Sequence, residues 1–419
     1  MKKLIVTLGL VGLLASPVLA QKRDLDNYRQ PDKRGLNVFE DPKDTISTFD
    51  GLNVRIGGAF ALQYQGISHE NAADAPELID LHNNFNLATA NLDIDVELYD
   101  GIRLHLRTYL SSRHHPEPYV KGGYMQVDNL NFIEEGFLED LMKNFTIRIG
   151  HMENNYGDAH FRRSDNAQAL YNPFVGNLIM DSFTTEVGAE VYYQNNGWLA
   201  MAGMTNGKLN QSVGSGGTQG SIIGKLGYDK QETEDFRWRL TGSVYHTGGS
   251  AKTWLYSGDR AGSRYYFVME EPGASSAGNF TSGRVDPMML HEMTSIMINP
   301  FVKYRGLEFF GVYEHVSGKA SFEPDTRSFD QYSAELLYRF GNNENFYVGG
   351  RYNLVKGTEF TTNNDIEIDR INLGAGWFMT KNILAKLEYV RQTYDGYSTD
   401  SKFNGGEFDG VVFEAVISF

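Results

Sequence analysis

Alternation of apolar and polar residues recurs along almost the whole chain and constrains the fold more than any other feature. In residues 88–98 the two kinds separate completely by parity: Ala88, Ala90, Leu92, Ile94, Val96 and Leu98 alternate with Thr89, Asn91, Asp93, Asp95 and Glu97. Residues two apart lie on the same face of a β-strand. A strand buried on both faces could not carry three carboxylates on one of them. The pattern therefore indicates a sheet with an apolar environment on one side and water on the other.

The same period of two continues along the chain, at residues 53–64, 102–107, 145–149, 186–193, 236–244, 296–304, 346–354 and 411–419. Pro300 lies within one of these runs and weakens its assignment, since a proline nitrogen cannot donate to a β-ladder. The stretch from Tyr119 to Phe132 is irregular and predicts a β-bulge. The chain contains 24 Tyr and 26 Phe, yet its mean hydropathy is −0.40. This combination suits a transmembrane barrel, in which only alternate residues meet lipid.

Connections between the predicted strands alternate between long and short. The long ones are 66–83, 112–117, 153–184, 208–219, 248–294, 318–328, 356–364 and 394–406. Most of the others are tight turns, with exceptions at 135–143 and 230–234. Short turns on one rim and long loops on the other are typical of outer-membrane barrels, in which the short turns face the periplasm. The sequence thus predicts an all-β, antiparallel transmembrane barrel of about 16 strands with both termini periplasmic. An 18-strand version would need a further hairpin, for which Ser263 to Met269 is the candidate.

The first twenty residues have the form of a secretory signal peptide. Lys2 and Lys3 precede an apolar stretch that is short for a membrane-spanning helix, and a small-residue cleavage pattern ends at Ala20. We expect residues 1–20 to be removed, residues 21–50 to form a charged periplasmic extension, and residues 51–419 to form the barrel. Within the extension, the segment 36–39 could pair with the barrel or enter its mouth.

Composition and motifs exclude several classes of function. The formal charge of −15 argues against nucleic acid as a partner. The absence of cysteine excludes disulfides and a lipid-attached N-terminal cysteine. No nucleophile elbow, phosphate-binding loop or dinucleotide fingerprint is present, and His69, His114 and His115 lack a spaced set of partners for a metal. The sequence therefore predicts no enzyme, no cofactor and no metal site.

The last predicted strand ends at Phe419 with an apolar residue at every second position from Val411. This ending resembles the C-terminal signal of outer-membrane barrels, an aromatic final residue after alternating apolar residues. The barrel-assembly machinery reads that signal. We therefore expect Phe419 to act as the assembly signal.

Residues 147–157 carry a resemblance to a known family. Their sequence, Ile147-Arg148-Ile149-Gly150-His151-Met152-Glu153-Asn154-Asn155-Tyr156-Gly157, resembles the strand that leads into the third loop of the 16-stranded porins, most closely the phosphate-selective porins of the O and P type found in Bacteroidetes-like sequences. The resemblance covers roughly residues 51 to 419. It implies an outer-membrane porin, a homotrimer, and a third loop that folds back into the lumen. The lysine cluster of the phosphate-selective members cannot be mapped onto this chain.

Independently of the family resemblance, the residues of the third loop, 153–184, have the features of a pore constriction. It is long and holds six apolar residues that water would not favour: Leu170, Phe174, Val175, Leu178, Ile179 and Met180. Folding against the inner wall would bury them and place charges of both signs in the channel, where they would sort solutes by size and charge. The predicted constriction residues are Asp158, His160, Arg162, Arg163 and Asp165. Alternatively, the loop packs on top of the barrel and its charges pair with each other.

Alternation also predicts which charges line the pore. On the basic side are Arg55, Arg103, Arg107, Arg148, Lys225, Arg237, Arg239, Lys303, Arg339, Arg351, Arg370 and Lys386. On the acidic side are Asp93, Asp95, Glu97, Glu186, Glu190, Glu308, Glu314, Glu335, Glu388 and Glu414. The two sets nearly balance, so they leave selectivity open. Ion-pair networks that stiffen the wall explain them at least as well as contacts with a solute.

These observations predict a passive porin for small hydrophilic solutes or ions, including anions such as phosphate. Its partners would be those solutes, outer-membrane lipid and lipopolysaccharide. An active transporter would need a far larger plug domain than residues 21–50 supply. The rival hypothesis is a surface adhesin or binding barrel with a closed lumen, for which loop 248–294 would supply contacts through Tyr256, Tyr265, Tyr266 and Phe267.

Overall fold

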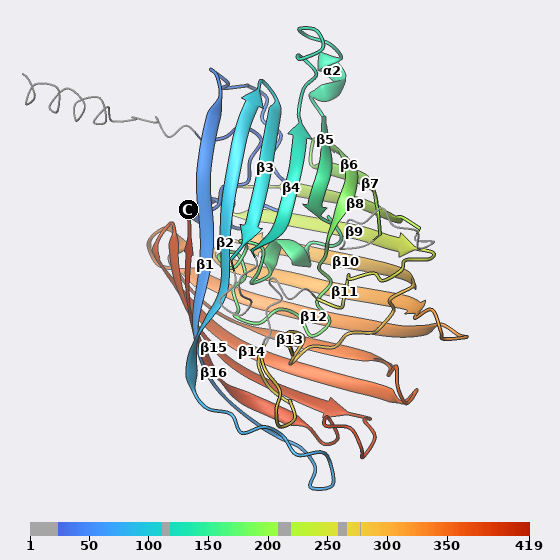
Figure 1. Ribbon diagram of the computed structural model, residues 1–419. Helices are drawn as coiled ribbons and strands as arrows, with labels where there is room; N and C mark the ends of the chain where they lie inside the picture. Colours follow the sequence, from blue (N-terminus) through green and yellow to red (C-terminus); the bar gives the residue numbers. More distant parts are fainter. Residues whose placement is uncertain (1–23, 111–117, 208–218, 259–265, 277) are drawn as a thin grey trace, which may run out of the picture.

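The computed structural model describes residues 24–110, 118–207, 219–258, 266–276 and 278–419. The predicted signal peptide lies outside these residues. Sixteen strands account for just over half of the described residues (Figure 1). Their bounds are β1 Asn53–Glu70, β2 Asn84–Tyr99, β3 Ile102–Tyr109, β4 Tyr119–Val127, β5 Phe145–Glu153, β6 Thr185–Asn195, β7 Trp198–Thr205, β8 Ser221–Gln231, β9 Phe236–Thr247, β10 Glu292–Tyr304, β11 Leu307–Lys319, β12 Arg327–Phe340, β13 Phe346–Thr358, β14 Asp365–Thr380, β15 Ile383–Asp395 and β16 Glu407–Ser418.

The strands form one closed antiparallel barrel in which each strand pairs with its neighbours in sequence. The barrel closes where β1 pairs with β16, from Ala59 opposite Ser418 to Glu70 opposite Glu407. Closure leaves no free strand edge among these sixteen. The prediction of a 16-stranded antiparallel barrel is confirmed. The 18-strand version is wrong, because Tyr266 to Met269 form no strand; Ser263 to Tyr265 lie outside the described residues.

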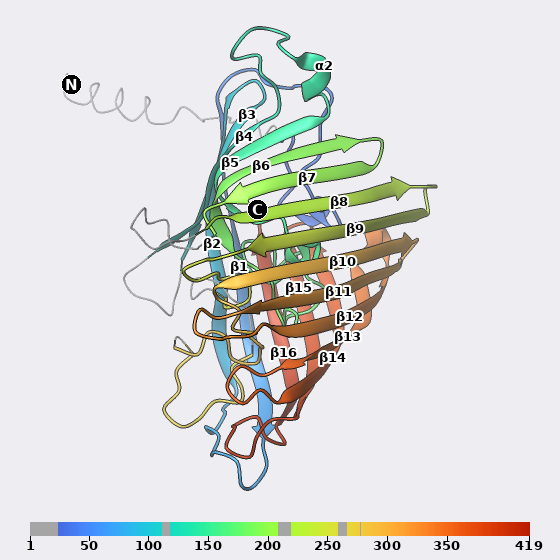
Figure 2. The same ribbon diagram turned by 90° about the vertical axis from the view of Figure 1, so that its right-hand side faces the viewer.

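Local irregularities fall close to where the sequence placed them. The predicted bulge is in β4, where Lys121 is the extra residue between the pairs Thr108–Val120 and Arg107–Gly122. β10 continues through Pro300, but its ladder to β11 is interrupted beside the proline. The connection between β4 and β5 is the longest on the short-turn rim and contains the helix α2, Glu139–Met142. Figures 1 and 2 both show α2 projecting beyond the ends of the strands.

Burial alternates along the strands as expected for a barrel with an apolar exterior. In β12 the inward side chains include Gln331, Glu335 and Arg339, all of them buried, whereas the outward Leu336 and Tyr338 are exposed. Outward apolar side chains gain by burial in lipid, while inward polar ones need partners inside the barrel. Among the described residues, no helix combines the length and the apolar character needed to span a membrane.

The interior of the barrel is largely filled by chain. Three segments contribute: residues 24–50, here called the N-terminal segment; residues 154–184, here called the inner loop; and the described parts of the loop between β9 and β10. Side chains of all three belong to one buried apolar cluster, which includes Phe39, Phe161, Ile179, Tyr256 and Val268. The N-terminal segment enters from the short-turn rim, where the backbone N–H of Lys33 donates to the carbonyl of Lys381 in the turn before β15.

Candidate pore constriction

The inner loop lies inside the barrel. Its apolar anchors pack mainly against the wall on the side of β10 to β16, and its polar groups also reach β2, β3, β8 and β9. Its six predicted apolar anchors are each at most 7% exposed. The ring of Phe174 lies against Gly374 of β14, where a Cβ atom would come within 3.0 Å of it. A backbone without regular structure needs hydrogen-bond partners at this depth. Wall side chains provide them: the N–H of Ile179 donates to Asn353 Oδ1 (2.7 Å) and that of Met180 to Gln331 Oε1 (3.0 Å).

The five predicted constriction residues all lie inside the barrel, and ion pairs fix most of them. Arg162 donates to Glu308 (2.9 Å) and Glu335 (3.1 Å) of the wall. Arg163 pairs within the loop with Asp181 (2.6 Å) and Asp165 (3.1 Å). His160 contacts the Glu153 carboxylate at the end of β5. Arg162 and Arg163 therefore hold the loop in place, and their guanidinium groups point into the packing rather than into open space.

Asp158, the fifth of these residues, joins the inner loop to the N-terminal segment. Its carboxylate accepts from Arg239 Nε (2.8 Å) and lies 2.7 Å from Lys225 Nζ. The same two cations hold Glu40 of the N-terminal segment, at 2.8 Å and 2.9 Å. Burial raises the pKa of Glu40, but the adjacent Arg239 and Lys225 outweigh this effect and bring the pKa to about 2. Both carboxylates are therefore ionised at neutral pH, and two cations balance them.

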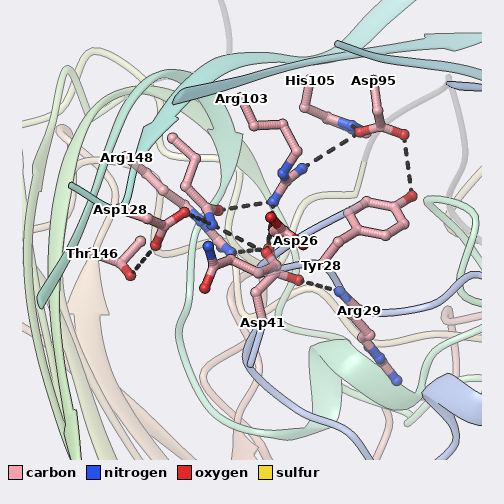
Figure 3. Close-up of polar contacts among 12 residues, drawn as sticks. Asp26, Tyr28, Arg29, Asp41, Asp95, Arg103, His105, Asp128, Thr146 and Arg148 are labelled. Atoms are coloured by element: carbon pink, nitrogen blue, oxygen red, sulfur yellow. Dashed lines mark hydrogen bonds and ion pairs between the residues drawn. The ribbon is translucent and has the colours of Figure 1, made fainter. Parts of the chain in front are cut away.

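The N-terminal segment is fixed at three further points in the lumen. The ring of Phe39 packs edge-on against Phe161 of the inner loop (6.1 Å between centroids) and Phe301 of β10 (5.5 Å). Asn37 Nδ2 donates to Glu308 Oε2 (2.7 Å). The third point is Asp41, which accepts from two arginines of the wall, as Figure 3 shows. The segment 36–39, expected to pair with the barrel or enter its mouth, lies inside it.

Two cavities lie along the wall formed by β2 to β5, and a further pocket of about 340 Å³ lies at the short-turn rim beside Arg237 and Arg239. A cavity of about 130 Å³ lies between that wall, the inner loop and the N-terminal segment. A second cavity, of about 360 Å³, lies nearer the short-turn rim, between the N-terminal segment and the α2 connection. The first is lined by charged groups of both signs, among them Arg29, Asp41, Asp93, Arg107, Lys121, Arg148 and Glu153.

Only some of the predicted pore-lining residues face this space. Asp93, Arg107, Arg148 and the constriction residue His160 line the first cavity, whereas Glu97 and Arg103 line the second. The other predicted residues do not line either of them. Arg55 pairs with Asp95, Arg351 with Glu335 and Arg239 with Glu40, while Glu190 accepts from the N–H of Asn155. The ion-pair networks weighed against solute contact are thus present over much of the wall.

Sequence reasoning missed the contribution of the N-terminal segment to the constriction. Tyr28, Arg29, Glu40 and Asp41 all contact the lumen wall or the inner loop. The available signal was weak: an aromatic residue, Phe39, next to two carboxylates in a stretch expected to be solvated. Among the residues that the structure describes, no group of three His, Asp or Glu side chains could hold a metal ion.

Comparisons with known proteins bear on the fold. No protein-family model matches the chain, and no curated protein matches it either. Solved structures do match. The trimer form of OmpT, an outer membrane protein of Vibrio cholerae, is 12% identical with a TM-score of 0.54, over 88% of this chain and 100% of that one.

Two other solved structures match to a similar extent. An anion-selective porin from Comamonas acidovorans is 12% identical with a TM-score of 0.54, over 88% of this chain and 100% of that one. The outer membrane channel DcaP of Acinetobacter baumannii is 11% identical with a TM-score of 0.53, over 89% and 99%. At such identities a likeness establishes the fold alone. The chain therefore shares its barrel fold with outer-membrane porins and channels.

Proposed function

We propose that the protein is an outer-membrane porin through which small hydrophilic solutes diffuse passively along the wall formed by β2 to β5. The two cavities on that wall carry the proposal, because they are the space that the inner loop and the N-terminal segment leave beside it. Both cavities have charged side chains of both signs in their lining, which suits passage of a hydrated solute. The outward apolar side chains suit a barrel surrounded by outer-membrane lipid and lipopolysaccharide.

Anions are the proposed preference among these solutes. The first cavity is lined by four cationic side chains, Arg29, Arg107, Lys121 and Arg148, and by three carboxylates, Asp41, Asp93 and Glu153. Three of the cations, Arg107, Lys121 and Arg148, lie on strands of the wall, so they would remain if the N-terminal segment shifted. Phosphate is one such anion, and the resemblance to the phosphate-selective porins supports it. That family and a homotrimeric assembly stay proposals.

Conductance across a planar bilayer tests the channel. We expect stable ohmic channels from the purified protein, and we expect Arg107→Gln to shift the reversal potential in a salt gradient toward cation selectivity. The substitution leaves Asp93, which now accepts from Arg107 at 2.7 Å, without this partner beside the cavity. Arg391→Gln is the matched control, since Arg391 faces outward on β15 and pairs with Glu407. It should leave the reversal potential unchanged.

The rival function is a surface barrel that binds a partner with its lumen closed. One observation favours it: the three segments in the lumen leave separate cavities of moderate size. Folded protein that gives no conductance at any voltage would contradict the porin and support this binding barrel. A reversal potential that is equal in Arg107→Gln and wild type would instead indicate that the solute does not pass along the β2–β5 wall.

A further inference from the structure

The contact between Asp41 and the barrel wall has the geometry of a carboxylate-binding site. One oxygen of Asp41, Oδ2, accepts from Arg148 Nη2 at 2.6 Å and from Arg103 Nη2 at 2.8 Å. The other oxygen, Oδ1, accepts from the backbone N–H of Arg29 at 2.9 Å. Figure 3 shows the two guanidinium groups converging on this carboxylate from neighbouring parts of the wall. Two charge-assisted hydrogen bonds to one oxygen are strong and directional.

The wall holds these two arginines in position without help from Asp41. Arg103 of β3 lies opposite Gln126 of β4, which lies opposite Arg148 of β5. Gln126 Oε1 accepts from both, at 3.0 Å from Arg103 and 2.9 Å from Arg148. The guanidinium of Arg148 also lies over the rings of Tyr124 and Tyr192, 5.4 Å and 5.0 Å from their centroids. Three adjacent strands therefore position both arginines. The N-terminal segment occupies the site through Asp41 and also contacts Arg103 through the carbonyl of Asn27 (3.3 Å) and the ring of Tyr28.

Asp41 is also the main source of compensating charge for this pair. Within the described part of the chain, the one carboxylate that forms an ion pair with Arg148 is Asp41. Arg103 has a second, longer ion pair with Asp95, at 3.5 Å. If the segment withdrew, Arg148 would keep its positive charge beside the cavity with no ion-pair partner. A buried, unpaired cation strongly favours binding of an anion.

We propose that Arg103 and Arg148 form a binding site for the carboxylate group of a small anionic solute, and that Asp41 occupies this site as an intramolecular competitor. The proposal rests on the proposed porin function, because the solute must reach the site through the lumen. It assigns the solute class by chemistry: the group already bound there is a carboxylate. A dicarboxylate suits the site further, since the adjacent Glu40 occupies a second pair of cations, Arg239 and Lys225.

Succinate binding to the whole, detergent-solubilised protein tests the site by isothermal titration calorimetry. Asp41→Asn removes the competing charge, so succinate should bind about tenfold or more tightly than to wild type, because the site is no longer masked most of the time. Asp44→Asn is the matched control: it removes the same charge from the same segment at a residue whose carboxylate, among the described residues, accepts from the N–H of Asn27 alone. It should bind succinate as wild type does.

Further variants and a second readout complete the test. Adding Arg148→Gln to Asp41→Asn should abolish the increase in succinate affinity. In wild type, succinate should speed hydrogen exchange of the N-terminal segment by displacing it, whereas sodium chloride of equal ionic strength should not. This second measurement also keeps the test valid if Asp41→Asn fails to fold.

Three outcomes would contradict the binding site. They can be distinguished from the outcomes that would contradict the channel. Equal succinate affinity in folded Asp41→Asn, Asp44→Asn and wild type contradicts the binding site. If Asp41→Asn binds inorganic phosphate more tightly than wild type does but binds succinate no more tightly, the assignment of the site to carboxylates is wrong. If succinate leaves hydrogen exchange of the N-terminal segment unchanged in wild type, succinate does not compete with Asp41 for the site. Ohmic channels without succinate binding would remove this site only, whereas succinate binding without conductance would remove the channel only.

Discussion

Arg162 is the residue on which the inner loop depends most directly. Its guanidinium bridges two wall carboxylates, Glu308 and Glu335, and donates to Asn37 of the N-terminal segment at 2.6 Å. It is 4% exposed. A buried ion pair adds little net stability compared with apolar packing, but the loss of one partner leaves the other charge buried and uncompensated.

We therefore expect Arg162→Ala to lower the free energy of unfolding by about 3–5 kcal/mol. Thermal or denaturant unfolding in detergent micelles measures this loss. Arg34→Ala, in the N-terminal segment, is a suitable control: the Arg34 side chain is half exposed, its pair with Asp24 is exposed, and its other partner, Asp32, keeps Lys381, so the expected loss is about 0–1 kcal/mol. A loss for Arg162→Ala as small as that of the control would mean that the loop is held by its apolar anchors alone.

Residue-level roles were predictable only in part. Alternation correctly placed Arg103, Arg107 and Arg148 on the inner face, since parity within a strand decides which face a side chain occupies. It could not say which of them face open space. That depends on where the inner loop lies, and the loop covers Arg351 and Glu335 while leaving Arg107 beside a cavity.

Among the elements, the N-terminal segment departs most from expectation. A charged stretch is usually solvated, and its composition gave no reason to place Glu40 and Asp41 inside a barrel. The cations that receive them lie on β3, β5, β8 and β9, far away in sequence. The folded sheet brings these cations together, because β3 to β9 form one continuous stretch of the wall. The inner loop was easier to predict, because its apolar residues had to be buried somewhere.

Locking the segment in place should lower conductance. The N–H of Lys33 donates to the carbonyl of Lys381 at 2.8 Å, so the two backbones are in contact and a cysteine pair at these positions is the natural place to try a disulfide. The chain has no native cysteine. We expect single-channel conductance of Lys33→Cys/Lys381→Cys to rise when the disulfide is reduced, because the segment then leaves the lumen more often. The single variant Lys33→Cys is the control; equal conductance in both redox states of the double variant would show that the segment does not gate the passage.

Acid should also release the segment. The pKa of Glu40 lies below the usual value of 4.5, at about 2, because Arg239 and Lys225 overcome the effect of burial. The facing carboxylate, Asp158, has a lowered pKa for the same reason. A lowered pKa contributes stability that is complete above the usual value and is lost as pH falls toward the pKa in the folded protein.

We expect the segment to stay docked from pH 7 to 5 and to loosen as pH falls from 4.5 toward 2. The anisotropy of a fluorophore on Thr45→Cys reports this change. Glu40→Gln should remove part of the pH dependence. Loosening that begins near neutral pH would point to a group other than these carboxylates.

At the scale of the whole molecule, the strand count and the two rims followed from the sequence. Sixteen alternating segments, separated by connections of alternating length, closed as predicted. The reason is that a barrel in lipid imposes one simple pattern on every strand. The filled lumen was not predictable in the same way, because packing inside the barrel depends on contacts between distant segments.

Phe419 concerns the assembly of the whole molecule, because the C-terminal strand resembles the assembly signal of outer-membrane barrels. Phe419 and Gly58 of β1 exchange two backbone hydrogen bonds, and Phe419 is 48% exposed. We expect Phe419→Ala to lower the amount of barrel in the outer membrane of a Gram-negative host while leaving refolding in detergent almost unchanged. Phe413→Ala, another exposed aromatic of β16, is the control. A similar loss in both variants would indicate lost lipid contact rather than a lost signal.

The seam between β1 and β16 sets the order of events during folding. Gln63 of β1 donates to Glu414 of β16, a residue 351 positions later. The entropy of closing so large a ring grows only slowly with its length. Exposure of the edges is the greater constraint: β1 has no partner on one side until β16 has formed. A sheet that forms before this seam closes exposes an unpaired edge at each end, and such edges promote aggregation. Closure of the seam is therefore the step that ends the exposure of the barrel to aggregation.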